Sequence, residues 1–326
     1  MKCGVYNWPW KTAPYPVSRR EVVYDQVKIG CVGSGYTGGY AGVAPQGTAP
    51  LTDPASAPST LTALWASASQ VQLSWFDMAS NATGFAVERR TGKDGTYVPI
   101  GTVGAGITRY TDTGLSANAT YSYRVRAQNS SGHSDYSLEA TARREDFSAG
   151  AADFAVQQGT WNTASGPYQV TSSGAGPINA SLSLLDIPVS GNFILTADCA
   201  SVGSSGAWDN FDIVFGYQDE KNFYYVNACE SANGAWNGLY KVVDGVTTKL
   251  TVWTTPFAPG TVYTMKVQRV GQSILVYRAG ALVASVPDTS FPLGKVGFGT
   301  SQPTSGPKLA QFANVTLTQS EIRGGQ

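Results

Sequence analysis

Hydrophobic and polar residues alternate along much of this chain with a period of two. Typical runs are Val71–Trp75 and Tyr263–Gln268, where apolar side chains stand at every second position. Such alternation predicts half-buried β-strands, and turn-forming residues separate the runs. No stretch keeps a helical apolar period over ~12 residues. The pattern therefore predicts an all-β protein.

Two changes in composition divide the chain. Residues 41–58, AGVAPQGTAPLTDPASAP, are rich in Pro, Ala, Gly, Ser and Thr, so they have too little apolar surface to fold alone. A second boundary is expected near Thr141–Glu145, where one strand pattern ends and another begins at Asp146. This boundary is short, which would hold the flanking domains close together. From the N-terminus, we expect a hairpin at 1–40, a linker at 41–58, a domain at 59–143 and a larger domain at 146–318.

Residues 59–143 contain about seven short strand patterns, the number found in a β-sandwich of this size. Trp75 stands at an inward position, Phe85 begins an alternating strand, and Leu115 precedes Tyr121 by six residues. These positions resemble a fibronectin type III domain over the whole segment, with Tyr121 as the tyrosine corner. The resemblance implies a spacer, as in bacterial glycan-degrading proteins. The expected strands begin at Leu61, Val71, Phe85, Tyr97, Arg109, Tyr121 and Tyr136.

The segment 146–318 carries more and longer strand patterns, which predict a two-sheet jelly roll. Asp244-Gly245 is a preferred type I′ turn between two of these strands. The most informative stretches are Asp146-Phe147, Gly216–Tyr225 and Phe312–Val315. They resemble the laminin G-like or concanavalin-like sandwiches attached to bacterial carbohydrate-active enzymes. The resemblance implies a carbohydrate-binding sandwich.

Charge and composition exclude several classes of partner. Lys plus Arg and Asp plus Glu are both 22, so the formal net charge is zero. Without a basic excess, we expect no binding of nucleic acid or of an anionic membrane. No apolar run of about 18 residues predicts a membrane span. Charged residues make up 13% of a chain rich in Gly and Tyr, which is typical of extracellular β-proteins, so we expect secretion, with the export signal outside this sequence.

The four cysteines fall into two pairs, one in the first segment and one in the last. Each pair flanks a predicted hairpin, which predicts the local disulfides Cys3–Cys31 and Cys199–Cys229, each worth about 3 kcal/mol. Four buried thiols are the alternative, because spacing does not prove connectivity. The cysteines lack C-x-x-C spacing and His133 is the single histidine, so we expect no zinc site.

The first forty residues carry two strand patterns, and a two-stranded hairpin is not stable alone. Lys2, Gly4 and Tyr6 match a Lys-x-Gly-x-Tyr strand. The segment resembles the last strands of jelly-roll polysaccharide lyases of the alginate and glucuronan type, whose catalytic groove carries that strand. Lys2 and Tyr6 would be catalytic only within a complete lyase domain, so we expect no catalytic residue in this chain. β-Elimination needs further acid, base and charge-neutralising groups, so the resemblance implies a lyase tail without a complete active site.

Carboxylate pairs are the remaining route to catalysis. Asp209 with Asp212, or Asp219 with Glu220, could serve glycoside hydrolysis. Strand alternation places Asp209 and Asp212 on opposite faces, and Asp219-Glu220 falls in a turn. We therefore expect a non-catalytic sandwich.

Two loops combine tryptophan with amide and carboxylate side chains, Gly206–Asn210 and Asn233–Gly238. A sugar ring stacks its C–H face on an aromatic plane while its hydroxyls need polar partners. Both loops flank the expected 211–226 hairpin on one side. The alternative role for each tryptophan is packing against the core. The predicted glycan-binding residues are Trp208, Asp209, Asn210, Trp236 and Asn237.

This interpretation requires no cofactor. A structural calcium ion, which is common in such sandwiches, would use oxygens such as those of Asp146 and Asp209.

The leading functional hypothesis is a glycan-binding and spacer region of a secreted polysaccharide-degrading protein, with a polysaccharide, acidic or neutral, as partner. One alternative is a self-assembling extracellular structural protein whose strands within residues 1–40 pair with a neighbour's sheet, giving a homo-oligomer. Another is a truncated polysaccharide lyase.

Overall fold

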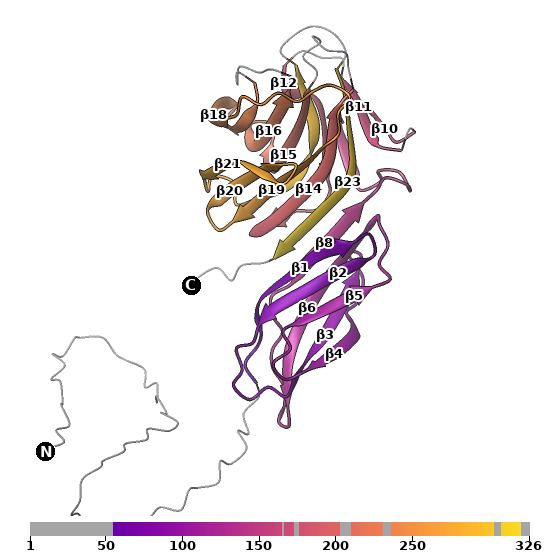
Figure 1. The fold of residues 1–326 in the computed structure, drawn as a ribbon, viewed down its shortest axis with the longest axis vertical. Helices are drawn as coiled ribbons and strands as arrows, with labels where there is room; N and C mark the ends of the chain where they lie inside the picture. The colour runs from indigo at the N-terminus through magenta and orange to yellow at the C-terminus, as the bar shows by residue number, and fades with distance from the viewer. Residues whose placement is uncertain are drawn as a thin grey trace, which may run out of the picture. The chain divides into compact units, whose positions relative to one another are not determined.

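The computed structural model describes residues 55–164, 166–172, 176–202, 210–230, 236–302 and 308–320. They form strands β1 to β23, and no helix occurs in this part of the chain (Figure 1). Consequently, no described helix could span a membrane. The all-β prediction is confirmed. The hairpin predicted at 1–40, with Lys2, Tyr6, Cys3 and Cys31, lies outside the described residues.

The first sandwich has strands β1 to β8. β1, β2 and β5 form one sheet, and β3, β4, β6, β7 and β8 lie in the other. Trp75 and Phe85 pack edge to face between them, with ring centroids 5.5 Å apart, as the strand alternation predicts. The strands are β1 Ser59–Ser67, β2 Gln70–Phe76, β3 Gly84–Thr91, β4 Val98–Gly104, β5 Arg109–Thr113, β6 Ala119–Asn129, β7 Gly132–His133 and β8 Ala140–Glu145.

A tyrosine corner closes this sandwich. The backbone N–H of Ser116 donates a hydrogen bond to Tyr121 Oη at 3.0 Å. Leu115 beside it is buried. The tyrosine corner expected at Tyr121 is therefore present.

The second sandwich has strands β9 to β23. One sheet has the order β18-β17-β16-β15-β22-β12-β9 with β13 beside β22, and the opposite layer has the order β21-β20-β19-β14-β23 with β11 beside β23. The strands are β9 Phe154–Gln158, β10 Thr160–Asn162, β11 Tyr168–Ser172, β12 Gly176–Leu185, β13 Val189–Ser190, β14 Asn192–Ser201, β15 Asn210–Asp219, β16 Asn222–Cys229, β17 Gly238–Val243, β18 Val246–Val252, β19 Tyr263–Val270, β20 Ser273–Arg278, β21 Ala281–Pro287, β22 Leu293–Gln302 and β23 Lys308–Ser320.

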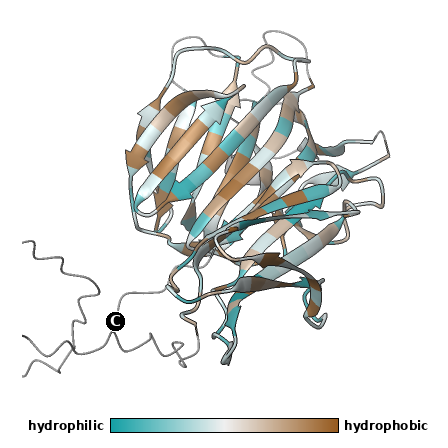
Figure 2. Cartoon of the chain, turned by 60° about the horizontal axis from the view of Figure 1, so that its bottom comes forward, coloured by the Kyte–Doolittle hydropathy of each residue, from teal (hydrophilic) through white to brown (hydrophobic). Residues whose placement is uncertain are grey.

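Alternating side chains build the core of the second sandwich. Figure 2 shows hydrophobic and hydrophilic residues succeeding one another along its strands. Phe298 of β22 and Phe312 of β23 stack across the two sheets with ring centroids 4.4 Å apart. Between β17 and β18, Asp244 and Gly245 have φ angles of 50° and 81°, the positive values that a type I′ turn requires. The turn is as predicted.

Strand β8 belongs to the hydrogen-bonded ladders of both sandwiches. It pairs with β6 on one side and with β23 on the other, so that one 12-stranded sheet contains strands of both sandwiches. Thr141–Glu145, expected to be a boundary between two strand patterns, lies inside this strand. Two residues later, Phe147 is already in the core of the second sandwich.

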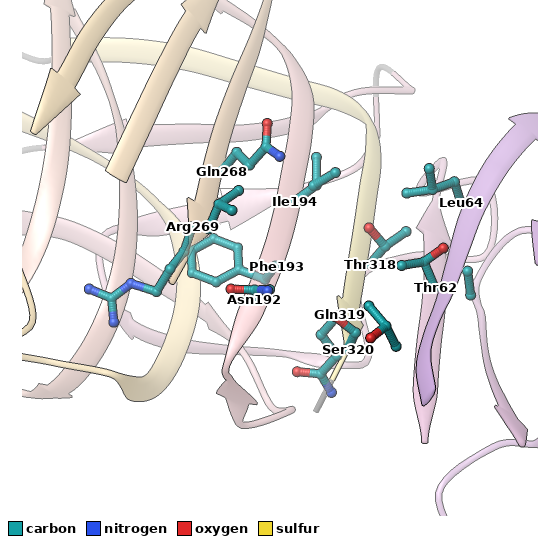
Figure 3. A pocket seen from close by; sticks show the side chains of 13 residues that line it. Thr62, Leu64, Asn192, Phe193, Ile194, Gln268, Arg269, Thr318, Gln319 and Ser320 are labelled. Carbon is teal, nitrogen blue, oxygen red and sulfur yellow. The ribbon is translucent and has the colours of Figure 1, made fainter. Parts of the chain in front are cut away.

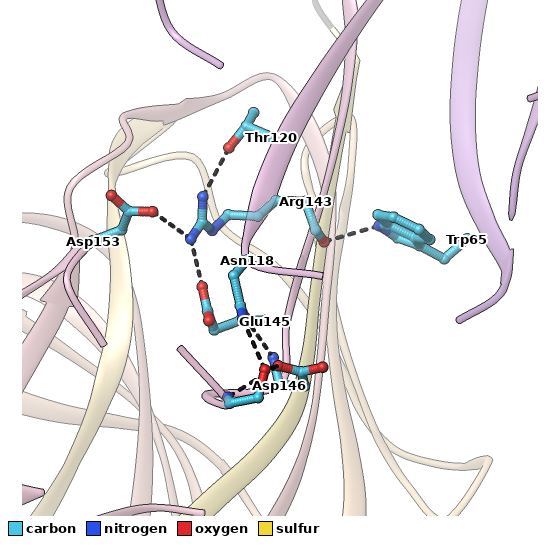
Figure 4. Close-up of polar contacts among 8 residues, drawn as sticks. Trp65, Asn118, Thr120, Arg143, Glu145, Asp146 and Asp153 are labelled. Carbon is cyan, nitrogen blue, oxygen red and sulfur yellow. Dashed lines mark hydrogen bonds and ion pairs between the residues drawn. The ribbon is translucent and has the colours of Figure 1, made fainter. Parts of the chain in front are cut away.

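A buried arginine lies on this shared strand (Figure 4). Arg143 donates hydrogen bonds to Glu145 of its own strand, to Asp153 at 2.6 Å and to Thr120 of β6 at 2.9 Å. Its backbone oxygen accepts a hydrogen bond from Trp65 Nε1 at 2.9 Å. The side chains of Arg143 and Glu145 are 5% and 4% exposed. This ion pair therefore ties the end of the first sandwich to the start of the second.

The predicted Cys199–Cys229 disulfide is wrong. Both residues are described, and the structure does not join them. Cys199 lies on β14 and points into the core between the sheets. Cys229 ends β16 of the opposite sheet, where alternation turns it to the same side as Tyr225, away from that core. The two sulfurs therefore project into different spaces.

Candidate functional site

The sheet containing β15, β16, β17 and β22 has a second apolar surface on the face turned away from the core, here called the outer face. Val214, Tyr225 and Tyr240 are register neighbours on β15, β16 and β17. The rings of Tyr225 and Tyr240 stack 4.8 Å apart with an interplanar angle of 9°. Lys249 on β18 places its ammonium 5.6 Å from the Tyr240 ring centroid. The outer face thus combines aromatic rings with a cation.

Glycines on β22 allow the strands under this face to pair closely. A Cβ on Gly297 would lie 2.1 Å from the backbone oxygen of Ser183, and one on Gly299 would lie 2.5 Å from that of Ser181. Backbone atoms of β12 cannot move aside without breaking the ladder. Gly299 is also the register partner of Asp212, and a Cβ at Gly299 would lie 4.0 Å from the Cβ of Asp212.

Four polar side chains meet on the outer face, and we call them the Asp212 cluster: Asn210, Asp212, Asn227 and Ser301. Asn227 Nδ2 donates hydrogen bonds to Asp212 Oδ1 at 2.7 Å and to Ser301 Oγ at 2.6 Å. Asn210 Nδ2 donates to the same Ser301 oxygen at 2.6 Å. Alternation along β15 and the Asp212–Asn227 register bring these groups together.

The Asp212 cluster contains more acceptors than donors. Asp212 Oδ2, Asn210 Oδ1 and Asn227 Oδ1 are buried and have no hydrogen-bond partner among the described residues. Burial raises the pKa of Asp212 to about 7, against the lowering effect of hydrogen bonds from Ser301 and Asn227. A buried carboxylate and two unpaired carbonyl oxygens are costly unless a proton, a cation or a ligand supplies what is missing.

Trp236 stands at the edge of the outer face and is 47% exposed. Its backbone oxygen accepts a hydrogen bond from Tyr240 Oη at 3.0 Å. The next residue, Asn237, is buried, and its Oδ1 accepts a hydrogen bond from the backbone N–H of Cys229 at 2.7 Å. Cys229 is in turn the register partner of Asn210. The backbone of Trp236 therefore contacts Tyr240 of the outer face, and Asn237 and Asn210 both lie next to Cys229.

The residues predicted to bind glycan have different environments. Trp208 and Asp209 lie outside the described residues. Asn210 and Asn237 are buried, and their side chains hold neighbouring strands, whereas Trp236 presents its ring to solvent. The structure therefore brings three of the five predicted positions to the same end of the strands in this sheet.

The candidate calcium ligand Asp146 has local partners. Its Oδ1 accepts hydrogen bonds from the backbone N–H and the hydroxyl of Ser148, and its Oδ2 pairs with Arg144 at 3.5 Å. Within the described residues, no three His, Cys, Asp or Glu side chains form a group that could hold a metal.

Sequence reasoning did not identify Asn227, Ser301 or the Tyr225–Tyr240 pair, and it weighed Asp212 only as a hydrolase carboxylate. The sequence does carry a signal for this polar cluster, because Asp212 and Asn227 interrupt strongly apolar strands. Recognising that they face each other requires the register of β15 against β16.

A second recess lies between β1 of the first sandwich and β14, β19 and β23 of the second (Figure 3). Its volume is about 190 Å³, and Leu64, Phe193 and Thr318 are among its lining residues. Arg269 also lines it, but the guanidinium donates to the backbone oxygens of Phe291 and Asp288 and is turned away from Thr318. The guanidinium of Arg269 is therefore already bonded to backbone oxygens outside the recess.

Comparison with known proteins identifies part of the chain. Residues 56–143 match the family model described as Fibronectin type III domain. An alignment of 131 positions that covers 36% of this chain is 35% identical to a protein described as an alpha-amylase from Niallia circulans. It spans 10% of that relative's length.

Several solved structures are similar to parts of this chain. The carbohydrate binding module CBM66 from Bacillus subtilis is 22% identical, with a TM-score of 0.42 over 51% of this chain and 94% of that one. A Bacillus subtilis protein with a galectin-like fold is 11% identical, with a TM-score of 0.42 over 55% and 96%. An Fn3-like protein from Clostridium thermocellum is 32% identical, with a TM-score of 0.24 over 27% and 90%. The family match confirms the prediction for the first sandwich, so residues 56–143 are a fibronectin type III domain.

Proposed function

We propose that the second sandwich is a glycan-binding module whose site lies at the Trp236 edge of the outer face. The observation that carries the proposal is the exposure of Trp236. Among the described residues of the second sandwich, no other aromatic side chain is exposed. An exposed indole plane suits a sugar ring, because the C–H face of the ring stacks on an aromatic plane.

The fixed backbone around Trp236 supports this role. The hydroxyl of Tyr240 donates a hydrogen bond to the backbone oxygen of Trp236, and the backbone N–H of Trp253 donates one to the backbone oxygen of Asn237 at 3.3 Å. A platform whose backbone is held before binding loses less conformational entropy when a ligand stacks on it. A shallow platform removes little surface from water, so we expect a dissociation constant near ~10⁻⁴ M.

The similarity to a protein described as an alpha-amylase supports placing this module in a secreted, polysaccharide-degrading protein. In that setting the fibronectin type III domain would act as a spacer. Catalysis is not part of the proposal. The lyase-like origin of residues 1–40, and self-assembly through that segment, stay predictions.

Replacing Trp236 with alanine is expected to weaken glycan binding by about 1–3 kcal/mol, because the stacking plane is lost while the backbone hydrogen bond from Tyr240 remains. The measurement is isothermal titration or affinity electrophoresis on a panel of neutral and acidic polysaccharides. Melting temperature should change little, since the ring is half exposed.

Phe76→Ala is the matched control. Phe76 is 65% exposed on the fibronectin type III domain, so its removal should leave binding unchanged. A folded Trp236→Ala protein that binds as tightly as the parent would exclude this edge of the sheet as the site.

A further inference from the structure

The Asp212 cluster contains a buried carboxyl group with no cationic side chain beside it. Asp212 is 0% exposed, and none of the ion pairs among the described residues involves it. Burial raises the pKa of Asp212, and hydrogen bonds from Ser301 and Asn227 lower it. No lysine or arginine contributes to the shift. The pKa of Tyr225, on the same face, is raised by burial and also by Asp212. Burying an ionised carboxylate without a cation has a desolvation cost that a bound cation would offset.

The unpaired atoms of the cluster are all oxygens. The amide nitrogens of Asn210 and Asn227 are directed at Ser301, which leaves both amide oxygens without donors. Together with Asp212 Oδ2 they form a set of one carboxylate and two carbonyl oxygens from two adjacent strands. Calcium prefers such oxygen ligands and tolerates irregular geometry, whereas zinc prefers nitrogen and sulfur, and magnesium keeps several waters in an octahedral shell.

We propose that Asp212, Asn210 and Asn227 bind a calcium ion on the outer face of β15 and β16. The cluster residues are 0–5% exposed apart from Ser301, which favours a bare ion over a sugar ring. The ion supplies the missing positive charge, and the three unpaired oxygens coordinate it. This site differs from the calcium site expected from sequence at Asp146 and Asp209, and it does not depend on glycan binding.

The test measures calcium directly on the full chain. Isothermal titration of the EDTA-treated protein should show a site with one calcium ion per chain that requires Asp212, and calcium should raise the melting temperature by mass action. Asp212→Asn keeps the shape but removes the charge, so we expect calcium affinity to fall by more than ~10-fold. In EDTA the same variant should melt no lower than the parent, because it no longer buries a carboxylate.

Asp198→Asn is the matched control. Asp198 lies on β14 of the opposite layer and is held by Thr264 and Asn314, so its replacement should leave calcium binding unchanged. If Asp212→Asn does not fold, Asn227→Ala should show the same loss of calcium affinity.

Three results would overturn the proposal. One is a parent protein whose melting is identical in calcium and EDTA and which binds no calcium, as expected if a proton or ordered water satisfies the cluster. Another is calcium binding that survives Asp212→Asn and Asn227→Ala. The third is calcium binding lost only on Asp209→Asn, which would return the ion to the site expected from sequence.

Discussion

Arg143→Ala is expected to lower the free energy of unfolding by about 3–5 kcal/mol, because it leaves Glu145 buried without a cation. Burial already raises the pKa of Glu145 despite the opposing effect of Arg143. The loss also removes the hydrogen bonds to Thr120 and Asp153. Urea denaturation followed by fluorescence would measure the change. Since β8 belongs to both sandwiches, we expect both to lose stability together.

Arg144→Ala is the control for this prediction. Arg144 is the neighbouring residue on β8, but its pair with Asp146 is partly exposed, at 19% and 30% for the two side chains. Exposed pairs contribute about 0–1 kcal/mol, so this variant should be nearly as stable as the parent. The double variant Arg143→Met with Glu145→Leu should recover much of the lost stability, since it removes both buried charges. Equal effects of Arg143→Ala and Arg144→Ala would contradict the role assigned to the buried pair.

Gly297→Ala is expected to lower the free energy of unfolding by about 3 kcal/mol and to reduce glycan binding with it. The new Cβ would lie 2.1 Å from the backbone oxygen of Ser183 and 2.9 Å from the Cα of Leu184. Both are main-chain atoms of the paired strand β12, so relief requires moving β12 away from β22 beneath the outer face. Thermal melting and glycan titration on the same samples would measure the two effects.

Gly104→Ala is the matched control. Gly104 ends β4, and a Cβ there meets nothing within 4 Å. The control should change stability by less than ~0.5 kcal/mol and leave binding unaltered. A stable Gly297→Ala protein with normal binding would show that β12 and β22 can separate without consequence for the outer face.

These effects have a common structural origin in pairing between distant strands. β8 joins the fibronectin type III domain to the second sandwich through β23, which is among the last strands of the chain. The outer face likewise depends on β12, β15 and β22 being adjacent, although many residues separate them in sequence. Stability and the candidate site are therefore sensitive to residues far from Trp236.

Sequence by itself determined the elements that rest on local chemistry. Period-two alternation predicts strands because successive side chains point to opposite faces. Asp244-Gly245 predicts its turn because these residues adopt positive φ at low cost, and Leu115 with Tyr121 predicts the tyrosine corner over a short span. The polar loop around Trp236 predicts a ring available for stacking on a sugar, with packing against the core as the alternative, and the structure exposes the ring.

Only the tertiary structure decided which strands became neighbours. Alternation does not say which sheet a strand joins, so it could not show that Cys199 and Cys229 project into different spaces. Nor could it show that β8 continues through the expected boundary, because its second partner, β23, lies more than a hundred residues away. The Asp212 cluster depends on the register of β15 against β16 and on β22 lying beside β15. Such pairings are set by packing of the whole core, because a shift of one residue would turn these polar groups to the opposite face.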